Sequence, residues 1–149
     1  MYVFTRGKHH RELAEELGAS WTGSAEDTPP NKVDSAIIFA PAGELVPASL
    51  RVLKKGGTVA LAGIHMSPIP QMEYKLIYEE RTLRSVAHST RQDVKSLLDL
   101  AAKIPVKTET ETFEFIEANL ALQKLERSEI RGSGVLMVST STPPDQYQS

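Results

Sequence analysis

Two apolar runs on either side of an amphipathic stretch constrain the fold of this chain more than any other feature. The runs cover residues 36–40 and 58–62; Asp34 and Pro41 bound the first, and glycines bound the second. Uninterrupted runs of this length are typical of strands covered on both faces of a sheet. Between them, apolar residues recur at helical spacing over 45–53 and end in two lysines and two glycines. The connection between such parallel strands is almost always right-handed, so we expect an open α/β sheet whose ligands bind beyond the carboxyl ends of its strands.

The same alternation of strand and helix patterns continues on both sides of this unit. Thr90 and Asp93 form the acidic variant of a capping box, which indicates a helix start. The patterns predict strands at 1–5, 20–23, 82–88 and 134–138, helices at 9–18, 90–101 and 117–125, and an exposed extended segment at 107–115. We expect one domain over residues 1–138, which includes the segment 107–138, and a disordered tail at 139–149.

The composition limits which binding partners and which cellular compartment we expect for this chain. A net charge of -2 over 149 residues gives no general attraction to nucleic acid or to anionic membranes. No apolar stretch approaches the roughly 18 residues that a membrane span needs, and the first residues lack a signal-peptide pattern. The absence of cysteine excludes disulfides, a cysteine-based zinc site and a thiol nucleophile. We therefore expect a cytoplasmic protein with no nucleic-acid or membrane partner.

The tip of the second strand decides which dinucleotide a Rossmann-like sheet prefers. An acidic residue there holds the ribose hydroxyls of NAD, whereas an arginine accommodates the 2′-phosphate of NADP. If residues 1–5 form that strand, its tip carries Thr5, Arg6 and Lys8 and no acid. Thr5 can donate a hydrogen bond, Arg6 can make a charge-assisted pair, and Lys8 adds a point charge. The tip favours NADP; the alternative is that Arg6 and Lys8 are solvated turn residues.

Two further turns at strand ends are candidates for cofactor contacts. Pro41 and Ala42 follow the first central strand, and small residues there let a cofactor lie against the backbone. Gly63, Ile64 and His65 follow the second central strand, where backbone groups can meet a nicotinamide and His65 could relay a proton. The alternatives are an ordinary strand-to-helix turn and a polar surface histidine.

Several kinds of site have no support in the sequence. His9 and His10 are neighbours, and adjacent helical side chains do not converge on one ion. There is no HExxH motif, no G-x-S-x-G elbow, no P-loop and no G-x-G-x-x-G turn. We assign neither a metal site nor a catalytic residue from these patterns.

Taken in order, four stretches resemble the C-terminal part of a zinc-dependent alcohol dehydrogenase of the medium-chain dehydrogenase/reductase superfamily. They are residues 1–20, 33–66, 80–103 and 112–138. The resemblance implies an incomplete Rossmann-like doubly wound parallel sheet. The stretch LKKGGTVALAG also resembles a strand of S-adenosylmethionine-dependent methyltransferases, but those enzymes usually carry an acid where this chain has Thr5 and Arg6.

The resemblance also implies positions for the cofactor NADP. The adenosine phosphate falls at Thr5 and Arg6, the ribose at Pro41 and Ala42, and the nicotinamide at Gly63, Ile64, His65 and the loop that holds Arg91. Members of the family often carry a Gly-Arg pair for the pyrophosphate after the last helix. Here Gly132 is followed by Ser133, although Arg131 is adjacent.

The departures from the family are larger than the matches. The zinc-binding catalytic domain, the first Rossmann strand and its glycine-rich turn are not in this sequence. The zinc polarises the alcohol oxygen in such enzymes. The resemblance therefore implies a truncated NADP-dependent alcohol dehydrogenase that is inactive alone; the alternative is a non-catalytic binding or assembly module.

The missing first strand predicts a gap in the sheet. In the strand order 3-2-1-4-5-6, it would lie between residues 1–5 and 36–40. Two open edges with unpaired backbone groups would remain. We expect the chain to close this gap as a homo-oligomer, as a strand-exchanged dimer, or by reusing residues 134–138.

Overall fold

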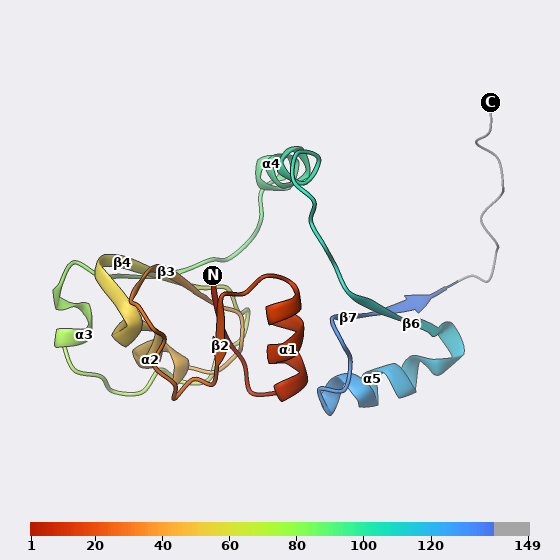
Figure 1. Cartoon of the computed structure of the whole chain (residues 1–149), viewed down its shortest axis with the longest axis horizontal. Helices are drawn as coiled ribbons and strands as arrows, with labels where there is room; N and C mark the ends of the chain where they lie inside the picture. The colour runs from red at the N-terminus through yellow and green to blue at the C-terminus, as the bar shows by residue number, and fades with distance from the viewer. Residues whose placement is uncertain (139–149) are drawn as a thin grey trace.

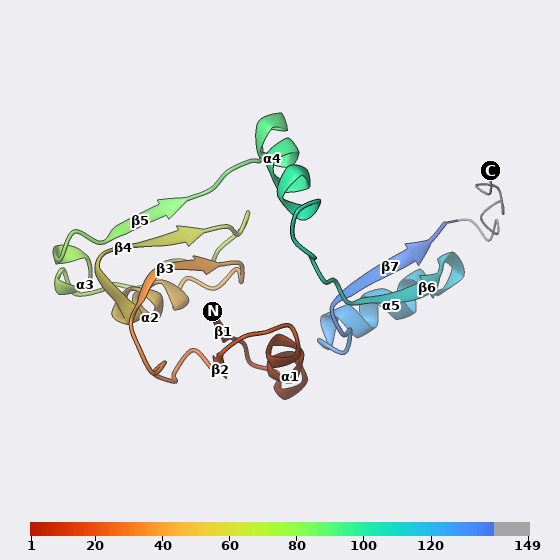
Figure 2. The same cartoon turned by 45° about the horizontal axis from the view of Figure 1, so that its top comes forward.

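The computed structural model describes residues 1–138, and all of the strands in this part run parallel to their partners. A three-stranded sheet has the order β3 (Val33–Ile38), β4 (Leu53–Leu61), β5 (Thr82–Ser85). A two-stranded sheet pairs β1 (Tyr2–Phe4) with β2 (Trp21–Gly23), and another pairs β6 (Thr110–Glu114) with β7 (Ser133–Met137). In Figure 2, β5, β4 and β3 lie one below the other, and β1 and β2 lie beyond β3. The expected α/β class with Rossmann-like parallel strands is confirmed.

Helices connect these strands as the sequence patterns predict. The helices are α1 (Lys8–Glu16), α2 (Leu45–Val52), α3 (Lys75–Tyr78), α4 (Arg91–Ala101) and α5 (Ala118–Glu126), with a 3-10 turn at Phe115–Glu117 before the last. The single turn α3 was not predicted, because four residues after a proline-bearing loop show no period. None of the helices within residues 1–138 has the length and apolarity that crossing a membrane requires.

The main core lies between α2 and one face of the three-stranded sheet. Val46 and Leu50 of α2 are fully buried against Val59 of β4 and Ile38 of β3. Leu53, also fully buried, is the first residue of β4, which starts five residues before the predicted strand. The early start depends on pairing between Val33 and Leu53 across a register shift, a long-range contact that no local pattern reveals.

Arg81, next to the start of β5, forms hydrogen bonds with the start of β4. Its side chain is only 6% exposed, and its guanidinium donates to the carbonyl oxygens of Leu53, Lys54 and Leu76. Arg81 also pairs with the Glu79 carboxylate at 2.7 Å. The hydrogen bond from Lys55 holds the pKa of Glu79 below its ordinary value of 4.5, with Arg81 adding to the effect.

The C-terminal segment differs from prediction. Residues 107–115 are not simply exposed, because β6 pairs with β7 over five residues and Phe113 packs with Ala121 and Ile130 in a small cluster. The same pairing shows that one suggested repair of the sheet is wrong: the strand predicted at 134–138 lies beside β6 and does not enter the gap. The predicted tail, 139–149, lies outside the described residues.

The helix α4 forms with the predicted capping box. The Thr90 hydroxyl accepts from the Asp93 backbone, and the Asp93 carboxylate accepts from the Thr90 backbone at 2.7 Å. The Thr90 hydroxyl also donates to the Asp93 carboxylate at 2.7 Å. The hydrogen bonds from this hydroxyl, and then from the Thr90 backbone, hold the pKa of Asp93 below its ordinary value because they stabilise the ionised carboxylate. The apolar side chains of this helix are exposed, with Leu97 and Leu98 more than 60% accessible, and the helix stands apart from the sheets (Figure 1).

Candidate functional site

Two loops at the carboxyl end of the three-stranded sheet lie against each other. The first follows β3 and the second follows β4. The Ser67 backbone N–H donates to the Pro41 carbonyl oxygen at 3.2 Å. The Ser67 hydroxyl accepts from the Gly43 backbone N–H at 2.8 Å and donates to the Glu44 carboxylate. A side chain at position 43 would place its Cβ 2.4 Å from the Pro68 carbonyl oxygen, so only glycine permits this approach.

The contact between these two loops brings together two of the predicted groups of site residues. Pro41 and Ala42 lie in the first loop, and Gly63 begins the second. A Cβ on Gly63 would lie 3.7 Å from the Phe39 carbonyl oxygen, which places the two strand ends side by side. Ile64 and His65 are exposed beyond them, Ile64 at 90%. Pro41, Ala42 and Gly63 thus form an accessible surface of small residues and backbone groups, which we call the ledge.

The third predicted group forms a separate corner between β1 and α1. The Thr5 backbone N–H donates to the Gly23 carbonyl oxygen at 2.8 Å, which leaves the Thr5 hydroxyl without a role in the strand pairing. The Arg6 side chain is exposed and makes no ion pair within residues 1–138. Lys8 makes only an exposed pair with Glu12 at 3.7 Å. Two cations therefore lie at the amino end of α1, where the helix dipole also favours an anion.

Arg91 is not brought to either group. It is the first residue of α4, a helix that is exposed along its length. The Val86 backbone N–H donates to the Leu61 carbonyl oxygen at 2.9 Å, so the chain leaves the sheet at the carboxyl ends of the strands. The contacts of the described residues do not carry Arg91 back to that edge.

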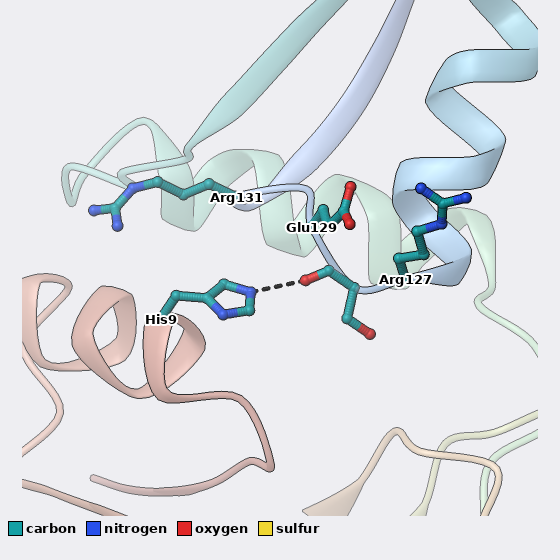
Figure 3. Close-up of a pocket in the computed structure, with 5 residues that line it drawn as sticks. His9, Arg127, Glu129 and Arg131 are labelled. Carbon is teal, nitrogen blue, oxygen red and sulfur yellow. Dashed lines mark hydrogen bonds between the residues drawn. The ribbon is translucent and has the colours of Figure 1, made fainter.

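A hollow of about 370 Å³ near the β1–α1 corner was missed by sequence reasoning (Figure 3). His9 of α1 and the residues after α5 line it, namely Arg127, Ser128, Glu129 and Arg131. The His9 Nε2–H donates to the Ser128 carbonyl oxygen at 2.8 Å, and Arg131 pairs with Glu16 of α1. Arg127 and Arg131, the two arginines around the turn after the last helix, are the sequence signal from which this hollow could have been predicted. None of the nine predicted cofactor residues lines this hollow.

The described side chains offer no donor set for a metal ion. Across residues 1–138 there is no group of three or more His, Cys, Asp or Glu side chains with suitable placement. The His9 and His10 rings are tilted by 49° with their centres 3.9 Å apart, but within residues 1–138 they belong to no group of three or more possible metal ligands.

A family model and the sequences of known relatives agree in matching this chain to dehydrogenases. A family model described as "Zinc-binding dehydrogenase" matches residues 1–103. The "Probable alcohol dehydrogenase AdhA" of Mycobacterium tuberculosis is 40% identical over 139 residues, which cover 93% of this chain and 40% of that protein. An alcohol dehydrogenase of Geobacillus stearothermophilus is 26% identical over 84% of this chain and 39% of its own length. The chain thus spans about two fifths of these relatives.

Solved structures share the fold. The cinnamyl alcohol dehydrogenase SbCAD4 of Sorghum bicolor superposes with a TM-score of 0.81 at 21% identity, over 97% of this chain and 43% of that one. The CAD of Helicobacter pylori, solved in complex with NADP(H), gives a TM-score of 0.75 at 16% identity, over 95% of this chain and 42% of that one.

Proposed function

The chain belongs to the zinc-binding dehydrogenase family, and from that premise we propose that it carries part of an NADP(H) site of an alcohol dehydrogenase. The observation that carries the choice of cofactor is the β1–α1 corner. Thr5, Arg6 and Lys8 supply one hydroxyl and two cations there, and Arg6 is exposed and free of ion pairs within the described residues. A 2′-phosphate would satisfy this corner, whereas the diol of NAD would find no carboxylate among residues 5–8 at the strand tip.

The ledge formed by the two strand-end loops suits the other half of the cofactor. Pro41 and Ala42 would lie beside a ribose, and the backbone of Gly63, Ile64 and His65 would face a nicotinamide. The contact between Gly43 and Pro68 fixes the spacing of the loops, because neither backbone can approach further. Arg91 could join the nicotinamide end only if α4 packed closer to the sheet. A bound nicotinamide supplies the hydride acceptor, and the chain's own residues bind and orient it.

The zinc that the family name implies does not fit the described part of the chain, since no donor set exists there. We derive no hydride-transfer step for these residues. We propose that the 149-residue chain is a truncated dehydrogenase that keeps cofactor contacts and is inactive alone. The lack of cysteine accords with a reducing compartment, and we propose a cytoplasmic location.

Direct titration calorimetry with NADPH and NADH tests the proposal. We expect saturable binding of NADPH and weaker binding of NADH. Arg6→Ala should weaken NADPH by roughly tenfold, the value of one charge-assisted hydrogen bond, and leave NADH unchanged. Arg51→Ala is the matched control, because Arg51 is an exposed arginine in the last turn of α2. Equal losses for both dinucleotides in Arg6→Ala would refute the phosphate role.

One structural observation favours the second candidate, a non-catalytic binding or assembly module. The edges of β1 and β3 that face each other are unpaired within residues 1–138. If neither dinucleotide binds at millimolar concentration, the cofactor proposal fails and the module remains.

A further inference from the structure

One serine holds the loop of residues 64–72, which lies between β4 and α3. Within residues 1–138, Ser67 makes every hydrogen bond that connects this loop to another part of the chain. The two prolines of the loop have no N–H to donate. The side chains of Met66 and Met72 also pack against the main core, but apolar contacts of this kind have no preferred direction. The position of the loop therefore depends on Ser67 more than on any other polar group.

All of the hydrogen bonds of Ser67 go to the first loop, which follows β3. Its backbone N–H donates to the Pro41 carbonyl oxygen at 3.2 Å, and its hydroxyl accepts from the Gly43 backbone N–H at 2.8 Å. The hydroxyl also donates to the Glu44 carboxylate at 3.4 Å, and this donation leaves an oxygen lone pair free to face Gly43.

The bond from Gly43 is the one that depends on the serine side chain most directly. Gly43 is buried, and its N–H donates to no other acceptor within residues 1–138. Loss of the Ser67 hydroxyl would leave this N–H without its partner, and an unpaired backbone donor is costly in a buried position. The first loop would then relax away from the second.

The ledge has no side chain that could hold a ligand by itself. Pro41, Ala42 and Gly63 offer only small side chains and backbone groups, and Ile64 is exposed beyond them. A ligand on such a surface is held by shape and by backbone hydrogen bonds, so its affinity depends on the spacing of the two loops. A residue that fixes this spacing before the ligand arrives lowers the cost of ordering the loops on binding.

We propose that Ser67 is a positioning residue for the nicotinamide half of the cofactor. It acts through Pro41 and Gly43, which it holds against the second loop, and it does not touch the ligand. It makes no hydrogen bond with the β1–α1 corner within residues 1–138, so the adenosine half of the site is independent of it. The inference rests on the proposed NADP(H) site and adds a residue to which the sequence patterns give no role.

Calorimetric titration of the 149-residue chain with two ligands, NADPH and 2′,5′-ADP, tests the proposal. The second ligand carries the adenosine and the 2′-phosphate but no nicotinamide. Ser67→Ala should weaken NADPH by roughly three- to tenfold, the value of about one hydrogen bond, and leave 2′,5′-ADP unchanged. Ser67→Thr keeps the hydroxyl and should bind NADPH like the parent. Ser96→Ala is the matched control, because Ser96 is an exposed serine of α4, and it should change neither affinity.

Amide exchange without ligand separates positioning from a loss of the fold. In Ser67→Ala, the Gly43 amide should exchange at least about fivefold faster, whereas the amides of β4 and β5 should keep their rates. Ser67→Thr should retain the parent rate at Gly43. Unchanged exchange at Gly43 in Ser67→Ala would show that the hydroxyl does not hold the loop, and that result overturns the proposal.

The two ligands also distinguish failure of this inference from failure of the proposed cofactor site. If Ser67→Ala weakens both ligands equally, or neither, the positioning role is wrong and the cofactor site stands. Equal affinity of the parent for NADPH and 2′,5′-ADP would show that the ledge adds nothing to binding, which also overturns the role of Ser67. If the parent binds neither ligand, the proposed NADP(H) site itself fails, and the role of Ser67 fails with it.

Discussion

The turn after α5 places a serine in a conformation that glycine prefers, and replacing it should stabilise the C-terminal segment. Ser128 has a φ of 57°, in the left-handed region. Its N–H donates to the Leu125 carbonyl at 3.0 Å, and the Glu129 N–H donates to the Lys124 carbonyl at 2.8 Å. These two bonds are those of a Schellman motif, which usually carries glycine at this position.

The helix α1 ends in the same motif with the usual residue. The Gly18 N–H donates to Glu15, and the Ala19 N–H donates to Ala14, at 2.9 and 2.8 Å. Gly18 has a φ of 98°, and a Cβ there would meet no heavy atom within 4 Å. The two turns therefore share the same pair of hydrogen bonds and differ in the residue at the left-handed position, so together they test the backbone cost.

The magnitude follows from two opposing terms. The left-handed conformation costs a residue with a Cβ about 1–2 kcal/mol. Glycine avoids this cost but loses more conformational entropy on folding, which offsets about 0.5–1 kcal/mol of the gain. Ser128→Gly should therefore stabilise α5 by about 0.5–1 kcal/mol, and Gly18→Ser should destabilise α1 by a similar amount.

Native-state hydrogen exchange is the appropriate assay, because the cluster around Phe113 is separate from the main core. Amides in α5 should exchange roughly two- to fivefold more slowly in Ser128→Gly. Ser128→Ala is the control; it keeps the Cβ and should leave exchange unchanged. If Ser128→Ala protects α5 as well as glycine does, the backbone argument is wrong.

Three further changes test other parts of the fold. Leu50→Ala removes a fully buried side chain and should lower the free energy of unfolding by about 2–5 kcal/mol in urea titrations. Gly43→Ala should displace the loop at Pro68, since its Cβ would meet a backbone carbonyl, and NMR shift changes should centre on that loop. The pKa of Glu79 is lowered by folding, so its contribution is present above its ordinary value of 4.5 and is lost as pH falls through the folded pKa. Denaturant midpoints measured through this range should fall less in Glu79→Gln than in the parent.

The elements found from the sequence are those whose signal is local. The runs at 36–40 and 58–62 and the spacing over 45–53 each identify an element without knowledge of its neighbours. The capping box at Thr90 and Asp93 is equally local. The early start of β4 and the burial of Phe113 depend on contacts with distant residues, Val33 in one case and Ala121 with Ile130 in the other. Periodicity carries no information on such contacts.

The candidate site shows the same division. Parallel strands end at one edge of a sheet, so the proximity of Pro41 to Gly63 could be predicted. The dependence of that edge on Gly43 could not, because Pro68 reaches it through a loop without a pattern. Arg91 was placed by resemblance alone, and the exposed position of α4 leaves that placement a prediction.

The two halves of the proposed cofactor site lie on different sheets. The Arg6 corner is carried by β1, and the ledge at Pro41 and Gly63 is carried by β3 and β4, while no strand joins the two sheets in the described residues. A dinucleotide that contacts both must meet the cost of ordering them relative to each other. By reciprocity, NADPH that binds both sheets should stabilise both, so amides of β1 and of β3 should exchange more slowly when NADPH is bound. Slower exchange in one of the two strands alone would show that one sheet alone holds the cofactor.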